Sequence, residues 1–132
     1  MANNSVFKRD FSKLLARAGD KVDLVVRKTA LTLQSSMIDK SPVATGRFRS
    51  NWACGIGAIN TATNAAPGSD AKGRTAVALG SWKPGQTIFL SNSMPYAVRL
   101  EKGWSKQAPL GIVALTVQDF AEAVAKAARE VR

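Results

Sequence analysis

The sequence predicts a small α+β domain with N-terminal helices, a short antiparallel sheet, and a C-terminal helix packed on that sheet. Three observations predict it. The chain has 132 residues, which suits one hydrophobic core. Apolar residues recur at helical steps near both ends and alternate in two short stretches between them. No internal repeat or linker separates two cores, so we expect a single domain over residues 1–132.

Two helices are expected in the first forty residues. Residues 6–18 predict a short amphipathic helix whose other positions are largely basic, because apolar side chains recur at three- and four-residue steps. These side chains are Phe7, Phe11, Leu14, Leu15 and Ala18. A second helix is expected from Asp20, a good N-cap residue, to about Lys40. It ends there because Pro42 pushes the residue before it out of the helical region.

Two strands are expected in the middle of the chain. Residues 48–58 alternate between apolar or small and polar side chains, and residues 86–92 alternate around Ile88 and Leu90. We expect the two strands to share one antiparallel sheet. The stretch between them, about 58–71, is small and polar with Pro67 and Gly68, and has no apolar face to bury. It predicts a mobile loop.

Three further helices complete the prediction. One spans about 71–82, and a short one begins at Pro95 and ends at Gly103. The last begins near Ile112 and should pack across the sheet through a near-heptad stripe. The members of that stripe are Val113, Val117, Phe120, Val124 and Ala128.

Charge and composition exclude several function classes. Nineteen Lys and Arg against nine Asp and Glu give a formal charge of +10, so polyanions are the natural partners. The chain has no histidine, which removes the usual general base and the commonest metal ligand. A single cysteine, Cys54, forms neither an internal disulfide nor a CxxC site. No apolar run is long enough to cross a bilayer. We therefore expect no catalytic residue, metal site, cofactor or membrane partner.

Two glycine motifs are weak signals of nucleotide binding. Residues 68–75 match the spacing of a phosphate loop, but Arg74 stands where lysine is needed and a loop precedes the motif instead of a strand. Gly55 and Gly57 resemble the start of a dinucleotide fingerprint, but the stretch after them is not helical. Close backbone approach or a bulge explains these glycines better. Cys54 is best explained as a small core side chain.

Two segments, 41–52 and 91–120, resemble the neck or tail-completion family of long-tailed double-stranded DNA phages. The first contains a Pro-Val-x-Thr-Gly-Arg turn followed by a strand with Trp. The second contains N-x-x-P-Y-A-x-x-L-E-x-G-x-S-x-Q-A-P-x-G. The matching residues are Pro42, Val43, Thr45, Gly46, Arg47, Asn51, Trp52, Asn92, Pro95, Tyr96, Ala97, Leu100, Glu101, Gly103, Ser105, Gln107, Ala108, Pro109 and Gly111. Ala44 stands where the family often has Asp, so any contact of that acid is in doubt here.

The resemblance implies a structural virion protein that catalyses no reaction. Such a protein is made in the bacterial host cytoplasm and joins tail to head as a ring around the DNA channel, with six copies as the expected number. Its implied partners are further copies of itself, the tail terminator or tail tube protein, head-side connector proteins, and DNA bound without sequence preference. A small basic nucleic-acid-binding module is the alternative from charge alone, and a phosphate-loop enzyme is a third and weaker one.

Three groups of residues are candidates for these roles. A structural turn between helix and strand is expected at Pro42, Thr45, Gly46 and Arg47. A subunit or partner interface is expected at Tyr96, Leu100, Glu101, Gly103, Trp104, Ser105, Lys106 and Gln107. Contacts to DNA phosphates are expected from Lys8, Lys13, Arg17, Arg47 and Arg49. We also expect Glu101 to pair with a basic residue within or between subunits, so that Glu101→Ala weakens assembly and leaves the isolated fold intact.

Overall fold

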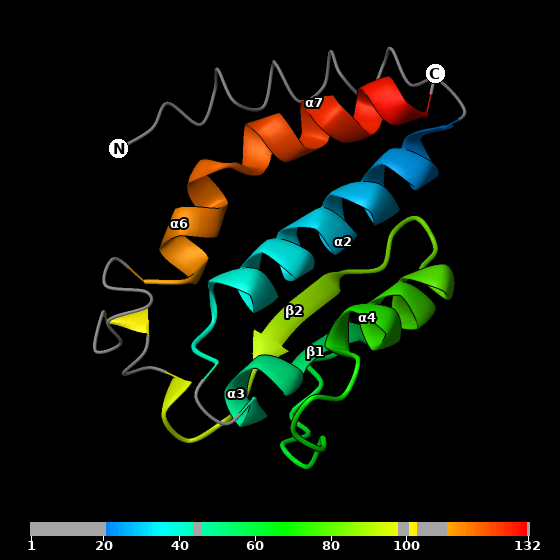
Figure 1. The fold of residues 1–132 in the computed structure, drawn as a ribbon. Coiled ribbons are helices and arrows are strands. Elements are labelled where there is room, and N and C mark those ends of the chain that lie inside the picture. Colours follow the sequence, from blue (N-terminus) through cyan, green and yellow to red (C-terminus); the bar gives the residue numbers. More distant parts are fainter. Residues whose placement is uncertain (1–20, 44–45, 98–100, 103–110, 132) are drawn as a thin grey trace.

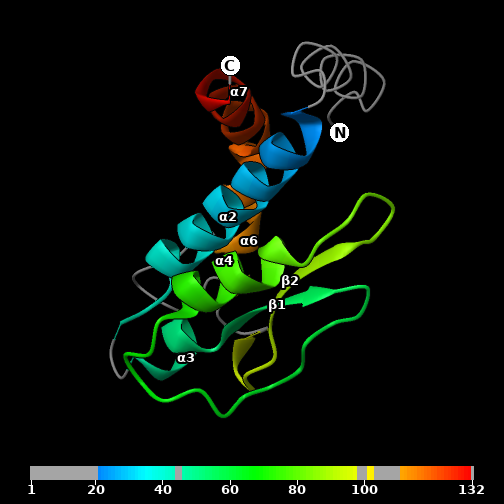
Figure 2. The same cartoon turned by 90° about the vertical axis from the view of Figure 1, so that its right-hand side faces the viewer.

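A central helix, α2 (Val22–Lys40), organises the fold and contacts most of the other elements. The structure is a computed structural model and describes residues 21–43, 46–97, 101–102 and 111–131. After α2 come α3 (Arg47–Ser50), β1 (Trp52–Ile56), α4 (Ala71–Gly80), β2 (Ile88–Asn92), α6 (Val113–Gln118) and α7 (Phe120–Glu130). In Figures 1 and 2, α2 lies between α7 on one side and α4 with the sheet on the other. The helix expected over residues 6–18 lies outside the described residues.

The two strands form one antiparallel sheet, as the alternating patterns predict. Trp52 pairs with Asn92 at one end and Ile56 with Ile88 at the other. The prediction that the first strand begins at residue 48 is wrong, because residues 47–50 form the helical turn α3. A spacing of four residues places Phe48 and Trp52 on one side of a helical turn as well as of a strand, and their ring centroids lie 5.9 Å apart.

Two clusters of buried side chains make up the core. One lies between α2, the sheet and the following turn, and it includes Met37, Ile38, Phe48, Trp52, Ala71, Met94 and Ile112. The other joins Val25 of α2 to α7 through Val124, Ala127, Ala128 and Val131. Together they confirm a small α+β domain.

The C-terminal helical segment meets the sheet at its beginning and then follows α2. Ile112, just before α6, shares a cluster with Trp52 of β1 and with the partly buried Leu90 of β2. Farther along, α7 packs on α2 (Figure 1). The single helix expected from Ile112 is divided at Asp119, whose N–H bonds Thr116 O at 3.0 Å and closes α6 with an i→i−3 turn. Aspartate favours helix ends over helix interiors, which fits a break there.

The segment between β1 and α4 is irregular, as expected from its small polar residues, but it is bonded to the fold at several points. The Ala65 N–H donates to Asn51 Oδ1 at 3.0 Å, and Asn51 Nδ2 donates back to Ala65 O at 3.3 Å. The Gly68 N–H donates to Ser50 Oγ at 2.8 Å. Mobility of this loop stays a prediction. No helix in the described residues is long and apolar enough to span a membrane.

Candidate assembly site

The turn after α2 is closed by side chains of the first motif segment. Ser41 is fully buried; its hydroxyl donates to Met37 O at 2.7 Å and accepts a hydrogen bond from Trp52 Nε1 at 2.7 Å. The guanidinium of Arg49 donates to the Asp39 and Ser41 carbonyls, at 3.1 Å each. These carbonyls end α2 and have no partner within the helix, so Arg49 acts as their cap.

The residues expected to form the turn and those expected to contact DNA lie in different environments. Gly46 has a φ of 71°, a left-handed conformation that favours glycine, and Pro42 is half-buried. Arg47 is exposed at the start of α3, and its contact with DNA stays a prediction. Arg49 is instead partly buried and bonded to the end of α2. Thr45, Lys8, Lys13 and Arg17 lie outside the described residues.

The second motif segment begins at β2 and is bonded directly to the first. Asn92 Nδ2 donates to Phe48 O at 2.8 Å, and Asn92 Oδ1 accepts from the Met94 N–H at 3.1 Å. The Tyr96 ring lies 5.7 Å from the Phe48 ring, and Phe48 in turn meets Trp52 edge to face. Two segments about forty residues apart in the sequence thus form one continuous contact.

Glu101 caps the start of α6. Its Oε1 accepts hydrogen bonds from the backbone N–H groups of Ile112 and Val113, at 2.9 and 2.8 Å. These N–H groups begin α6 and lack partners within the helix, and a carboxylate is favoured near a helix N-terminus. Gly111 precedes them with a φ of 91°, and a Cβ there would lie 2.7 Å from Glu101 O. The motif glycine thus allows the close approach of Glu101.

A cavity of about 220 Å³ lies where the two motif segments meet. It is lined by Phe48, Trp52, Leu90, Ser91, Asn92, Ala97, Glu101, Ile112 and Val113. The lining is mainly apolar, and its one carboxylate already accepts hydrogen bonds from α6. Such a cavity suits an apolar side chain of a partner better than a reaction. The remaining residues expected at the interface, Leu100, Gly103, Trp104, Ser105, Lys106 and Gln107, lie outside the described residues.

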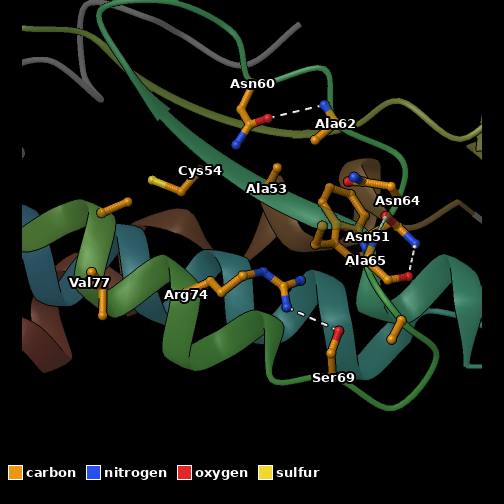
Figure 3. A pocket seen from close by; sticks show the side chains of 13 residues that line it. Asn51, Ala53, Cys54, Asn60, Ala62, Asn64, Ala65, Ser69, Arg74 and Val77 are labelled. Carbon is orange, nitrogen blue, oxygen red and sulfur yellow. Dashed lines mark hydrogen bonds between the residues drawn. The ribbon is translucent and has the colours of Figure 1, made fainter.

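A larger cavity, of about 430 Å³, lies under the irregular loop between β1 and α4 (Figure 3). Sequence reasoning missed it, although three asparagines in and before the loop, Asn51, Asn60 and Asn64, were a signal of polar lining. Arg74 crosses this cavity from α4 and donates to Ser69 Oγ at 3.0 Å and to Ser50 O.

Burial raises the pKa of the Cys54 thiol, which keeps it neutral and poorly nucleophilic.

The geometry of residues 68–75 gives no support to phosphate binding. Thr75 is fully buried; its hydroxyl donates to Ala71 O at 2.9 Å and accepts from Gln34 Nε2 at 3.3 Å. Asp70 Oδ1 accepts from the Gly73 N–H at 2.8 Å and so places a carboxylate at the N-terminus of α4. The side chains that would hold phosphate and metal in a phosphate loop are therefore bonded within the fold.

The chain was compared with protein-family models, curated proteins and solved structures. It matches none of them. Within the described ranges, no three metal-ligating side chains lie close enough to hold an ion. Membership of the neck family therefore stays an expectation, which rests on the resemblance of the two motif segments.

Proposed function

We propose that this protein is a structural component of a tailed phage, one that joins tail to head as a ring of copies around the DNA channel. The observation that supports this best is the convergence of the two motif segments. Their described side chains bond to one another and to the backbone around a cavity, and among these described residues none is arranged for a reaction. Through these hydrogen bonds, the motif residues hold the chain after β2 at one end of the domain, where a neighbouring subunit can contact it.

Two exposed apolar side chains in the motif segments fit a contact surface. Val113 lines the cavity and is 41% exposed, and Val43, in the turn of the first motif segment, is 51% exposed. Apolar side chains that stay exposed at the edge of a bonded core are typical of surfaces that a partner covers. In a ring, the surface of one copy meets a different surface of the next.

The alternative, a basic module that only binds nucleic acid, receives less support from the charges. Arg27, Arg49 and Arg74 donate to backbone carbonyls within the fold, so some of their hydrogen-bond donors are engaged there. Five further cations lie within 4.0 Å of carboxylates: Lys28, Lys40, Lys72, Lys126 and Arg129. Exposed pairs of this kind are weak, but they lower the field available to a phosphate backbone.

Co-sedimentation tests the proposal. Labelled protein is mixed with separated phage tails, DNA-filled heads or free duplex DNA, at low and at near-physiological salt. We expect tails or heads to retain the protein at the higher salt while free DNA loses it, because a shaped apolar contact is less salt-sensitive than phosphate binding. Binding to free DNA alone, and only at low salt, would favour the nucleic-acid module instead.

Glu101 gives a sharper prediction. Because its carboxylate caps α6, Glu101→Ala is expected to lower the free energy of unfolding by about 1 kcal/mol and to reduce retention on tails or heads. A loss of this size weakens the isolated fold without unfolding it, so the expectation that the fold stays intact remains a prediction. Glu101→Gln keeps an accepting oxygen and should lose less of both. Urea unfolding and co-sedimentation of the three proteins check this; equal stability of all three would contradict the cap.

A further inference from the structure

One edge of β1 is not bonded to β2 and lies in the wall of the cavity under the loop between β1 and α4. The Gly57 N–H donates to Thr87 O at 2.8 Å, immediately after the last residue pair of the sheet. Hydrogen bonds alternate along an antiparallel pair, so Gly55 also bonds β2, while the backbone groups of Cys54 and Ile56 point away from it. These outward groups have no hydrogen-bond partner among the described residues. An unbonded strand edge can accept a further strand.

The cavity places this edge between a loop and a helix. In Figure 3, Ala53 and Cys54 of β1 lie between Asn60 and Ala62 of the loop and Arg74 of α4. A groove between a strand edge and a helix suits an extended peptide that adds to the sheet, with backbone hydrogen bonds for affinity and side-chain contacts for specificity. The volume of about 430 Å³ is within the range of cavities that bind ligands. It therefore suits a short extended segment.

The polar groups of the cavity favour a carboxylate. Arg74 is the one charged residue among those that line it. Bonds to Ser69 Oγ and Ser50 O hold its guanidinium in place, and a guanidinium has more N–H groups than these bonds use. Asn60 Oδ1 accepts from the Ala62 N–H at 3.1 Å, and Asn60 Nδ2 has no partner in the part of the chain that the structure describes. Donors held beside a positive charge, with no carboxylate in the lining, select an anionic acceptor.

Exposed apolar side chains border these donors. Val77 lines the cavity three residues after Arg74, on the same face of α4, and is 79% exposed. Ile59, next to Asn60 in the loop, is 57% exposed. A peptide segment covers such side chains, whereas a free anion leaves them in water. The surroundings of the cavity therefore favour a carboxylate that belongs to a peptide.

We propose that this cavity binds an extended peptide segment of a partner protein, which adds to the free edge of β1 and places an acidic side chain on Arg74. The backbone of the segment bonds the N–H and C=O groups of Cys54, and its apolar side chains cover Val77. The chain's formal charge of +10 favours an acidic partner. Binding at this cavity goes beyond the proposed function and does not depend on it, since it requires neither a ring nor DNA.

Alkylation of Cys54 measures occupancy of the cavity. Cys54 lines the cavity, is half-buried and is the only cysteine of the chain. The full-length protein is treated with iodoacetamide, a neutral reagent, at mildly alkaline pH, and intact mass gives the rate. The probe is an acetylated, amidated pentapeptide of threonine and valine with a central aspartate. We expect the rate to fall to a plateau as the peptide concentration rises. A rate that stays the same at every concentration would overturn the proposal.

Matched peptides separate the carboxylate from the backbone contacts. With asparagine in place of the aspartate, half-protection should need about tenfold more peptide, because a charge-assisted hydrogen bond is lost. N-methylation is placed on one residue of the probe or on the next; one of these two N–H groups must face β1, so at least one of the peptides should lose protection. Full protection by both methylated peptides would exclude strand addition. Equal protection by N-acetylaspartate amide would mean that the cavity takes a small carboxylate instead of a peptide.

Protein variants test the charge at the cavity. Arg74→Gln should weaken the aspartate peptide about tenfold or more. Because Arg74 also bonds Ser50 and Ser69, a charge pair at the exposed Val77 gives a test that leaves the fold unaltered. Val77→Glu should weaken the peptide about threefold relative to Val77→Lys. Lys83→Gln, at an exposed position after α4, should leave binding unchanged. Equal affinities of the two Val77 variants would overturn the assignment of an acidic side chain.

Discussion

Replacing Gly55 with alanine is expected to lower the free energy of unfolding by about 3 kcal/mol or more. Gly55 lies in β1, where the chain that leaves the strand passes directly against it. A Cβ at this position would overlap the Ala58 carbonyl oxygen and lie 2.9 Å from Asn60 N. Both neighbours are backbone atoms, so they cannot rotate away as a flexible side chain could. The loop over β1 would have to separate from the strand.

Gly80 supplies a matched control for this substitution. It is the last residue of α4, is exposed, and has no atom within 4 Å of an added Cβ. Gly80→Ala should therefore raise the free energy of unfolding by about 0.5 to 1 kcal/mol, because alanine restricts the unfolded chain. Urea unfolding followed by tryptophan fluorescence and circular dichroism measures both variants. A Gly55→Ala protein with an unchanged midpoint would contradict the close approach.

Removal of the Trp52 side chain should have a still larger effect, of about 3 to 5 kcal/mol for Trp52→Ala. The side chain is 4% exposed, meets Phe48 edge to face and donates its indole N–H to Ser41. It also lines the cavity between the two motif segments. We therefore expect this variant to lose retention on tails and heads together with its stability.

Two further variants separate packing from hydrogen bonding at this site. Trp52→Phe keeps an aromatic ring in the core but has no N–H for Ser41, so a smaller loss of about 1 to 3 kcal/mol is expected. Val77→Ala, at a position 79% exposed on α4, should change the stability by less than about 0.5 kcal/mol. Denaturant midpoints of the three proteins give the comparison. A loss in Trp52→Phe equal to that in Trp52→Ala would assign the whole effect to the hydrogen bond.

Much of the fold could be predicted where one period extends over many residues. The helix up to Lys40, the helix from residue 71 and the strand around Ile88 and Leu90 lie where the patterns place them. The errors fall on short segments. Phe48 and Trp52 fit a strand and a helical turn equally well, and the division at Asp119 interrupts a stripe that continues on both sides of it.

The candidate site was predictable as a set of residues but not as a set of contacts. The second motif singled out Glu101, for which its charge suggested a basic partner, and charge alone singled out Arg49 as a phosphate contact. In the structure both side chains bond the backbone at helix ends. Which hydrogen bonds a charged side chain makes depends on the groups that the fold leaves unpaired near it, and local patterns do not contain that information.

The amino-acid sequence by itself determined the class of this protein: the α+β order of elements, the basic charge, the lack of histidine chemistry and the two motif segments. These properties follow from composition and from short-range periodicity, which any stretch of chain carries within itself. The tertiary structure alone decided that Asn92 bonds Phe48, that Gly55 must be glycine, and that Arg74 and Thr75 are bonded within the fold. The contacts of Asn92 with Phe48 and of Arg74 with Ser50 join residues far apart in the chain, and they exist only once packing has brought those residues together.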